Sequence, residues 1–219
     1  MIDSRIRAVM NFVCESSRVA DIGADHGYLS IELIKSGRAS SVIATEKNIE
    51  PLKALRKNVS EFGLDGVIDV RLGDGLKILS AGEVDTICIA GMGGSLITKI
   101  LAAAPEVVQS ARQIIIQPMN GANKVRDWFK KNKLTIVDED LAESAGIIYE
   151  IICAERTPPK KFFKRESSPL LKKFLTQRSE KLQRVLDEMS KSKSAQTSEK
   201  FSATLAELEA LNKKIGSLI

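Results

Sequence analysis

Glycine and acidic residues follow a predicted strand near the start of the chain, in a pattern suited to ligand binding. The segment is Asp21-Ile22-Gly23-Ala24-Asp25-His26-Gly27-Tyr28-Leu29, and a predicted helix comes directly after its first glycines. The glycines allow a tight turn and a close approach of the backbone to a ligand, and the helix amino terminus favours a carboxylate. The spacing is G-x-x-x-G, which differs from the G-x-G-x-x-G of dinucleotide sites.

Two further acidic side chains come at the ends of the next two predicted strands. Glu46 follows the glycine turn by about 20 residues, where a carboxylate can accept hydrogen bonds from ribose hydroxyls. Asp74, within Gly73-Asp74-Gly75, can accept a hydrogen bond from the exocyclic amine of adenine. The alternatives are an exposed strand-end glutamate and a plain Asp-Gly turn. Because ligands bind at the carboxyl ends of strands in open α/β sheets, the three groups together indicate an adenosyl ligand.

The fourth and fifth predicted strands end in segments that could face an acceptor. Ala90-Gly91-Met92-Gly93-Gly94 predicts an open backbone wall, and Gln117-Pro118-Met119-Asn120 offers amide groups for recognition of a base. The alternative for the second segment is a strand-ending turn with a helix cap at Asn120.

Alternating strand and helix patterns predict the elements that position these residues. The predicted strands are Arg18–Ile22, Ser41–Thr45, Val67–Leu72, Val84–Ala90 and Gln113–Gln117. The predicted helices are 3–15, Gly27–Lys35, Ile49–Phe62 and Gly121–Lys131. This βαβ order predicts a parallel sheet with helices on both faces. Leu134–Leu141 and Ile147–Ala154 leave no room for a helix between them, so they predict a hairpin whose last strand is antiparallel.

The last part of the chain has a different composition. Residues 156–219 carry 15 Lys and Arg against 7 Asp and Glu, a net charge of +8, whereas residues 1–155 have a net charge of −3. Two apolar stripes flank the polar segment Ser190–Ser198 and predict an antiparallel helical pair. We therefore predict a catalytic domain over residues 1–155 and a basic helical domain over residues 156–219. The basic tail suggests an anionic macromolecular partner, with a lysine-rich solvated surface as the alternative.

The motifs together resemble the bacterial tRNA (adenine(22)-N1)-methyltransferase family. The resemblance rests on the first glycine segment, on Ala90–Gly94, on Gln117–Asn120 and on Gly146–Ile152, and the helical tail fits the family's coiled-coil domain. It implies a Rossmann-like class I methyltransferase sheet closed by an antiparallel hairpin. It also implies S-adenosylmethionine as cofactor, with S-adenosylhomocysteine as product, and tRNA as partner.

The motif pattern and the resemblance assign roles to individual residues. The residues expected at the reaction centre are Asp25, Gly91 and Met92. The residues expected to bind the cofactor are Asp21, Gly23, Asp25, His26, Gly27, Tyr28, Leu29, Glu46, Lys47, Gly73, Asp74, Gly75, Ala90 and Gly91. The residues expected to bind the substrate are Gly93, Gly94, Gln117, Pro118, Asn120, Lys160, Lys161, Lys164, Arg165, Lys172 and Lys173. For Tyr28, packing at the helix start is favoured over stacking on a base.

Composition limits the remaining classes of function. Cys14, Cys88 and Cys153 form no CxxC pair and His26 is the only histidine, so no metal site is expected. There is no apolar run of membrane-spanning length and no secretory signal pattern, so we expect a cytoplasmic protein. A nicotinamide dehydrogenase is disfavoured by the glycine spacing and the hairpin, and a small-molecule methyltransferase by the basic tail. A methyltransferase acting on another RNA and a non-enzymatic RNA-binding adaptor stay open, as does the oligomeric state, for which a monomer is plausible.

Overall fold

The structure of the protein is a computed structural model that describes residues 3–156 and 168–218. The chain divides into two compact units, Met1–Arg165 and Glu166–Ile219, and each is described here by itself. The division into domains 1–155 and 156–219 stays a prediction, because residues 157–167 are outside the described part.

The first unit is built around a seven-stranded sheet with the strand order β3-β2-β1-β4-β5-β7-β6. The strands are β1 Ser17–Ile22, β2 Ala39–Glu46, β3 Ile68–Leu72, β4 Thr86–Gly93, β5 Gln113–Asn120, β6 Thr135–Ser144 and β7 Ile147–Glu155. The first five strands are parallel, and β7 pairs antiparallel with both β5 and β6. The predicted parallel sheet with an antiparallel closing hairpin is therefore confirmed.

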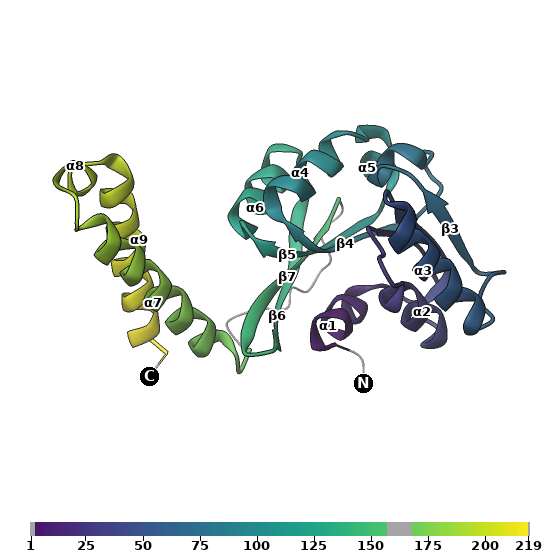
Figure 1. The fold of residues 1–219 in the computed structure, drawn as a ribbon, viewed down its shortest axis with the longest axis horizontal. Helices are drawn as coiled ribbons and strands as arrows, with labels where there is room; N and C mark the ends of the chain where they lie inside the picture. The colour runs from purple at the N-terminus through teal and green to yellow at the C-terminus, as the bar shows by residue number, and fades with distance from the viewer. Residues whose placement is uncertain (1–2, 157–167, 219) are drawn as a thin grey trace. The chain divides into compact units, whose positions relative to one another are not determined.

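Helices cover both faces of this sheet (Figure 1). The helices on one face are α1 Ser4–Phe12, α2 Tyr28–Lys35 and α3 Ile49–Glu61, and those on the other are α4 Gly94–Ala102, α5 Pro105–Ser110 and α6 Ala122–Lys131. Each face has its own buried apolar cluster. The helices contribute through apolar residues at helical spacing, such as Leu52, Leu55 and Val59 of α3. The central strands are apolar on both sides because both sides are covered.

Some elements differ from the prediction. Helices α4 and α5 and the short 3₁₀ helix η1, Gly75–Ile78, were not predicted. Strand β4 continues through Gly93 and β5 through Asn120, so both extend beyond their predicted ends. The interpretation of Asn120 as a helix cap is wrong, because Gly121 occupies the cap position of α6 in a left-handed conformation.

The second unit is the predicted helical pair. Helices α7, Leu171–Met189, and α9, Glu199–Gly216, pack against each other. Their buried residues are Leu171, Phe174, Leu175 and Leu186 of α7 and Leu208 of α9. An ion pair between Arg178 and Glu207 and a 2.7 Å hydrogen bond between Ser179 and Asn212 join the two helices. The polar segment between them is not a plain turn, because Lys193–Gln196 forms the short helix α8.

Candidate active site

Backbone hydrogen bonds hold the predicted loops together at the carboxyl edge of the sheet. The amides of Gly23 and Ala24 donate to the carbonyl oxygen of Thr45 at 2.9 and 3.0 Å, and the amide of Gly73 donates to that of Glu46 at 2.9 Å. These bonds join the ends of β1, β2 and β3. The three motifs that the sequence placed on separate strands therefore form one site.

Two cavities of about 230 Å³ each open at this edge, and Gly23 lines both. We call them the Asp21 cavity and the Glu46 cavity. The Asp21 cavity is lined by Arg5, Ile6, Asp21, Gly23, Ala24, Asp25, His26, Tyr28, Leu29, Ala90, Gly91 and Gln117. The Glu46 cavity is lined by Ile22, Gly23, Thr45, Glu46, Lys47, Asn48, Gly73, Asp74, Gly75, Met92, Leu96 and Ile100. An elongated ligand could extend from one cavity to the other past Gly23.

In the Glu46 cavity, the carboxylate of Glu46 is oriented by its own chain. The side chain is 8% exposed, and its Oε1 accepts from the amides of Lys47 at 2.9 Å and Asn48 at 3.0 Å. Its second oxygen has no hydrogen-bond partner among the described residues and can accept from a hydroxyl. Asp74 is exposed, and the neighbouring ammonium of Lys77 lowers the pKa of its carboxyl, which keeps it an ionised acceptor.

One buried hydroxyl in the same cavity lacks a partner. Thr45 is fully buried and lines the Glu46 cavity, and its Oγ1 makes no hydrogen bond within the described chain. A buried hydroxyl without a partner costs about 1–3 kcal/mol, and a bound water or ligand is one way in which such a group is satisfied. This hydroxyl is consistent with a polar ligand in the Glu46 cavity.

The Asp21 cavity contains a carboxyl group with a perturbed pKa. Asp21 is 4% exposed, and burial raises the pKa of its carboxyl to about 6, although Ser30 Oγ donates to Oδ2 at 2.7 Å and opposes the shift. Asp25 lies nearby with a positive φ of 51°, and its Oδ2 is 3.7 Å from Nε2 of His26. These carboxyl groups favour a cationic ligand group here.

Met92 lies where the two cavities approach each other. Gly23 has a positive φ of 72°, and a Cβ on it would lie 2.2 Å from Cε of Met92. The left-handed backbone conformation favours glycine at this position, whereas the contact is with the end of a side chain that can move. The thioether side chain is flexible and can adjust to a ligand that crosses Gly23.

Gln117 connects β5 to the wall formed by β4. The side chain is buried, and its Oε1 accepts from the amide of Gly91 at 3.1 Å, which fixes the backbone where Gly91 has a positive φ of 76°. The amide oxygen predicted for base recognition is thus already used within the protein. Tyr28 is 56% exposed at the rim, with its ring centroid 5.7 Å from that of His26, so the favoured packing role for Tyr28 does not fit this exposure.

The structure brings most of the predicted residues to the two cavities, but not all of them. Gly27 caps α2 and lines neither cavity, and Gly93, Gly94, Pro118 and Asn120 also line neither. Lys172 and Lys173 lie on α7 of the second unit. Lys160, Lys161, Lys164 and Arg165 lie outside the described residues. The role of each of these residues stays a prediction.

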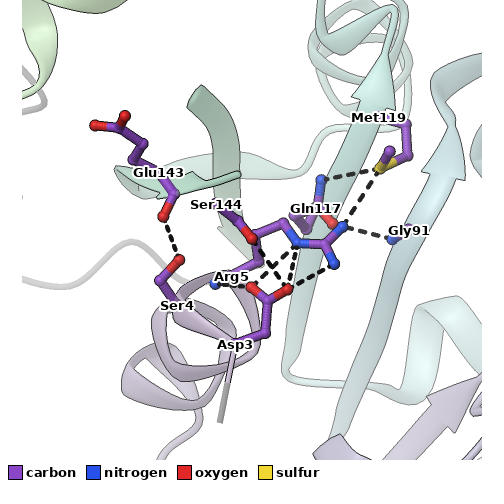
Figure 2. A network of polar contacts seen from close by, with 8 residues as sticks. All are labelled: Asp3, Ser4, Arg5, Gly91, Gln117, Met119, Glu143 and Ser144. Atoms are coloured by element: carbon purple, nitrogen blue, oxygen red, sulfur yellow. Dashed lines mark hydrogen bonds and ion pairs between the residues drawn. The ribbon is translucent and has the colours of Figure 1, made fainter. Parts of the chain in front are cut away.

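Arg5 was missed by the sequence analysis. It lies on α1 and lines the Asp21 cavity, with its guanidinium held by Asp3 and directed toward Met119 (Figure 2). A single arginine in an amphipathic helix carries no sequence signal of a site, because it looks like any solvent-facing cation.

Comparisons with known sequences and structures show which family the chain belongs to. The methyltransferase domain family matches residues 2–152. The tRNA (adenine(22)-N(1))-methyltransferase of Bacillus subtilis is 36% identical over 154 residues, which are 70% of this chain and 65% of that protein. The crystal structure of the B. subtilis tRNA methyltransferase for this modification superposes with a TM-score of 0.79 at 30% identity, covering 98% of both chains. The chain belongs to the tRNA (adenine(22)-N(1))-methyltransferase family.

A further structure of this methyltransferase fold includes the methyl donor. The Streptococcus pneumoniae protein was solved in complex with S-adenosyl-L-methionine, and it matches with a TM-score of 0.85 at 32% identity over all of both chains. The present chain spans about two thirds of the B. subtilis sequence in the sequence match, and nearly all of the solved structures. Among the described residues, no helix is long and apolar enough to cross a membrane, and no group of metal-binding side chains is found.

Proposed function

We propose that this chain transfers a methyl group from S-adenosylmethionine to N1 of adenine 22 in tRNA. The observation that carries the proposal is the pair of cavities that meet at Gly23, with carboxyl groups suited to an amino acid at one end and to a nucleoside at the other. Family membership supports the same reaction. Since the proposed substrate is tRNA, we propose a cytoplasmic site of action.

The residues present fit the methyl donor. The buried Asp21 suits the α-ammonium group of a methionine moiety, and the free oxygen of Glu46 suits a ribose hydroxyl. Asp74 suits the adenine amine, and Thr45, whose buried hydroxyl has no partner among the described residues, lines the same cavity. When bound, S-adenosylmethionine supplies an electrophilic methyl group at its sulfonium, which this fit would place close to Gly23.

The protein has to position the acceptor rather than remove a proton from it. Adenine N1 carries a lone pair and is nucleophilic as a neutral base, so an in-line approach of about 3–3.5 Å is the main requirement. The Ala90–Gly91 backbone, fixed by Gln117, forms the wall of the site, and the exposed Tyr28 ring lies at its rim. Because the product is cationic, an exposed carboxylate such as that of Asp25 would stabilise it.

The second unit is proposed to bind tRNA through its phosphates. Lys172 and Lys173 are exposed on α7, in the part of the chain with a net charge of +8. Phosphate contacts weaken as salt is raised, so a K172E/K173E variant should bind tRNA more weakly and with a smaller salt dependence, while its affinity for S-adenosylhomocysteine stays the same. Unchanged tRNA affinity would remove these two lysines from the proposal.

The reaction is tested with labelled S-adenosylmethionine and unmodified bacterial tRNA, followed by nucleoside analysis. We expect label in 1-methyladenosine, and no label when guanosine replaces adenosine at position 22. Label in 1-methyladenosine from both tRNAs would refute the site, and label in another nucleoside would refute the acceptor. Cofactor binding without any transfer to tRNA would favour a different RNA substrate.

A further inference from the structure

Arg5 places a permanent positive charge in the Asp21 cavity. Among the described residues that line this cavity, it is the only lysine or arginine. The side chain is 28% exposed and comes from α1, an element that precedes the sheet and carries none of the sequence motifs. The positive charge in this cavity therefore comes from an element outside the motifs.

Two residues hold the guanidinium of Arg5, Asp3 and Tyr149, and Figure 2 shows the contacts with Asp3. Asp3 accepts from Nη2 at 2.8 Å and from Nε at 3.1–3.2 Å, and the ring of Tyr149 lies with its centroid 5.0 Å from the guanidinium carbon. Asp3 itself is fixed, because its carboxylate also accepts from the backbone amide of Arg5 and from Ser144 Oγ. A guanidinium fixed in this way loses little conformational entropy when it binds a ligand.

The remaining nitrogen of the guanidinium is weakly used. Among the described residues, Nη1 contacts the thioether sulfur of Met119 at 3.7 Å, and sulfur is a weak acceptor. A carboxylate oxygen would form a charge-assisted hydrogen bond at this nitrogen, which is about twice as strong as a neutral one. The geometry therefore leaves one edge of Arg5 available for an anionic group in the cavity.

A methionine moiety carries both an α-ammonium and an α-carboxylate. Apart from Arg5, the charged side chains that line the Asp21 cavity are acidic. Asp21 and Asp25 are acidic and suit the ammonium, but they would repel the carboxylate. Arg5 supplies the opposite charge in the same cavity. We propose that Arg5 binds the α-carboxylate of the methionine moiety of the methyl donor, which rests on the proposed function above.

The proposal is tested by removing the charge from the protein and the carboxylate from the ligand. Calorimetry would measure binding of S-adenosylhomocysteine, and of 5′-methylthioadenosine, which has the adenosine and sulfur but no amino acid end. For Arg5→Gln we expect affinity for S-adenosylhomocysteine to fall roughly 10- to 100-fold, the range for loss of a charged hydrogen bond, and affinity for 5′-methylthioadenosine to change less than about twofold. Arg5→Lys should restore part of the loss.

Arg7→Gln provides a matched control, since it makes the same charge change on the same helix outside either cavity. Thermal unfolding without ligand checks that each variant is folded. Equal weakening of both ligands, or unchanged binding of S-adenosylhomocysteine, would overturn the role of Arg5. If the wild-type chain bound neither ligand, the proposed cofactor itself would be wrong, so the two failures are distinguishable.

Discussion

Replacing Asp21 with asparagine should stabilise the ligand-free protein while weakening its response to the cofactor product. The substitution keeps the size of the side chain and leaves an oxygen that can accept from Ser30 Oγ, now 2.7 Å from Oδ2. It removes a charge that burial makes unfavourable, since the pKa of Asp21 is raised from 3.8 to about 6. The carboxylate is thus kept at a cost to stability, as expected for a group that serves binding.

The size and pH dependence of the effect follow from the shifted pKa. Because the folded state holds the proton more tightly than the unfolded state, Asp21 destabilises the fold progressively as pH rises from about 4 to about 6, and fully above that. A shift of this size corresponds to about 3 kcal/mol at pH 8 and about 0.5 kcal/mol at pH 4. The gain in the free energy of unfolding for Asp21→Asn should follow the same curve.

Denaturant unfolding at several pH values tests this directly. Trp128 is the only tryptophan and lies on α6, so its fluorescence reports on the first unit alone. With S-adenosylhomocysteine present, wild type should gain more stability than Asp21→Asn at pH 8, because only the wild type can pair a carboxylate with the ligand ammonium. As a control, Asp85→Asn should lose stability at pH 8, because Arg18 lowers the pKa of Asp85. A gain for Asp21→Asn that is the same at pH 4 and pH 8 would refute the reasoning.

Three further substitutions test other parts of the site. Thr45→Val should raise the free energy of unfolding without ligand by about 1 kcal/mol, because it removes a hydroxyl that has no hydrogen-bond partner among the described residues. Thr86→Val is the control and should lower the free energy of unfolding, because the hydroxyl of Thr86 is hydrogen-bonded. Denaturant unfolding measures both changes. Glu46→Gln should weaken S-adenosylhomocysteine and 5′-methylthioadenosine alike, about tenfold by calorimetry, because both contain the ribose; an effect on one ligand alone would contradict this role. Gly94→Ala should destabilise the fold by about 1–3 kcal/mol, since its Cβ would lie 2.3 Å from the carbonyl oxygen of Gly121, and an unchanged unfolding midpoint would contradict the close approach.

The positions of the strands along the chain and the closing hairpin could be predicted because their signals are local. Val19, Ala20 and Ile22 of β1 belong to a short apolar run typical of a strand buried on both faces, and the five residues between the predicted strands Leu134–Leu141 and Ile147–Ala154 are too few for a crossover helix. Helix α4 was harder to predict, since Gly94 begins it and Ile97, Thr98 and Ile100 are β-branched. Its formation depends on tertiary packing against the sheet, which a local pattern does not record.

The same distinction applies to the residues of the site. Asp21, Glu46 and Asp74 were predictable because each lies at or just after the carboxyl end of a strand, and these ends meet at one edge of a parallel sheet. The partner of Gln117 was not predictable, because the amide of Gly91 reaches it only through the pairing of β4 with β5. The sequence identified which residues reach the edge, whereas their hydrogen bonds within the protein decide which atoms are left for a ligand.

Helix α1 shows how a residue outside the motifs can complete a site. The loops at the strand ends supply acidic side chains and backbone amides. A ligand whose amino acid end carries both an ammonium and a carboxylate also needs a positively charged side chain, which has to come from another element. Arg5 meets this need because Asp3, two residues earlier in the sequence, orients it, and because the ring of Tyr149 in the closing hairpin supports it. The hairpin therefore has a role beyond closing the sheet: with Ser144 bonded to Asp3, it fixes the position of the helix that brings the positive charge to the cavity.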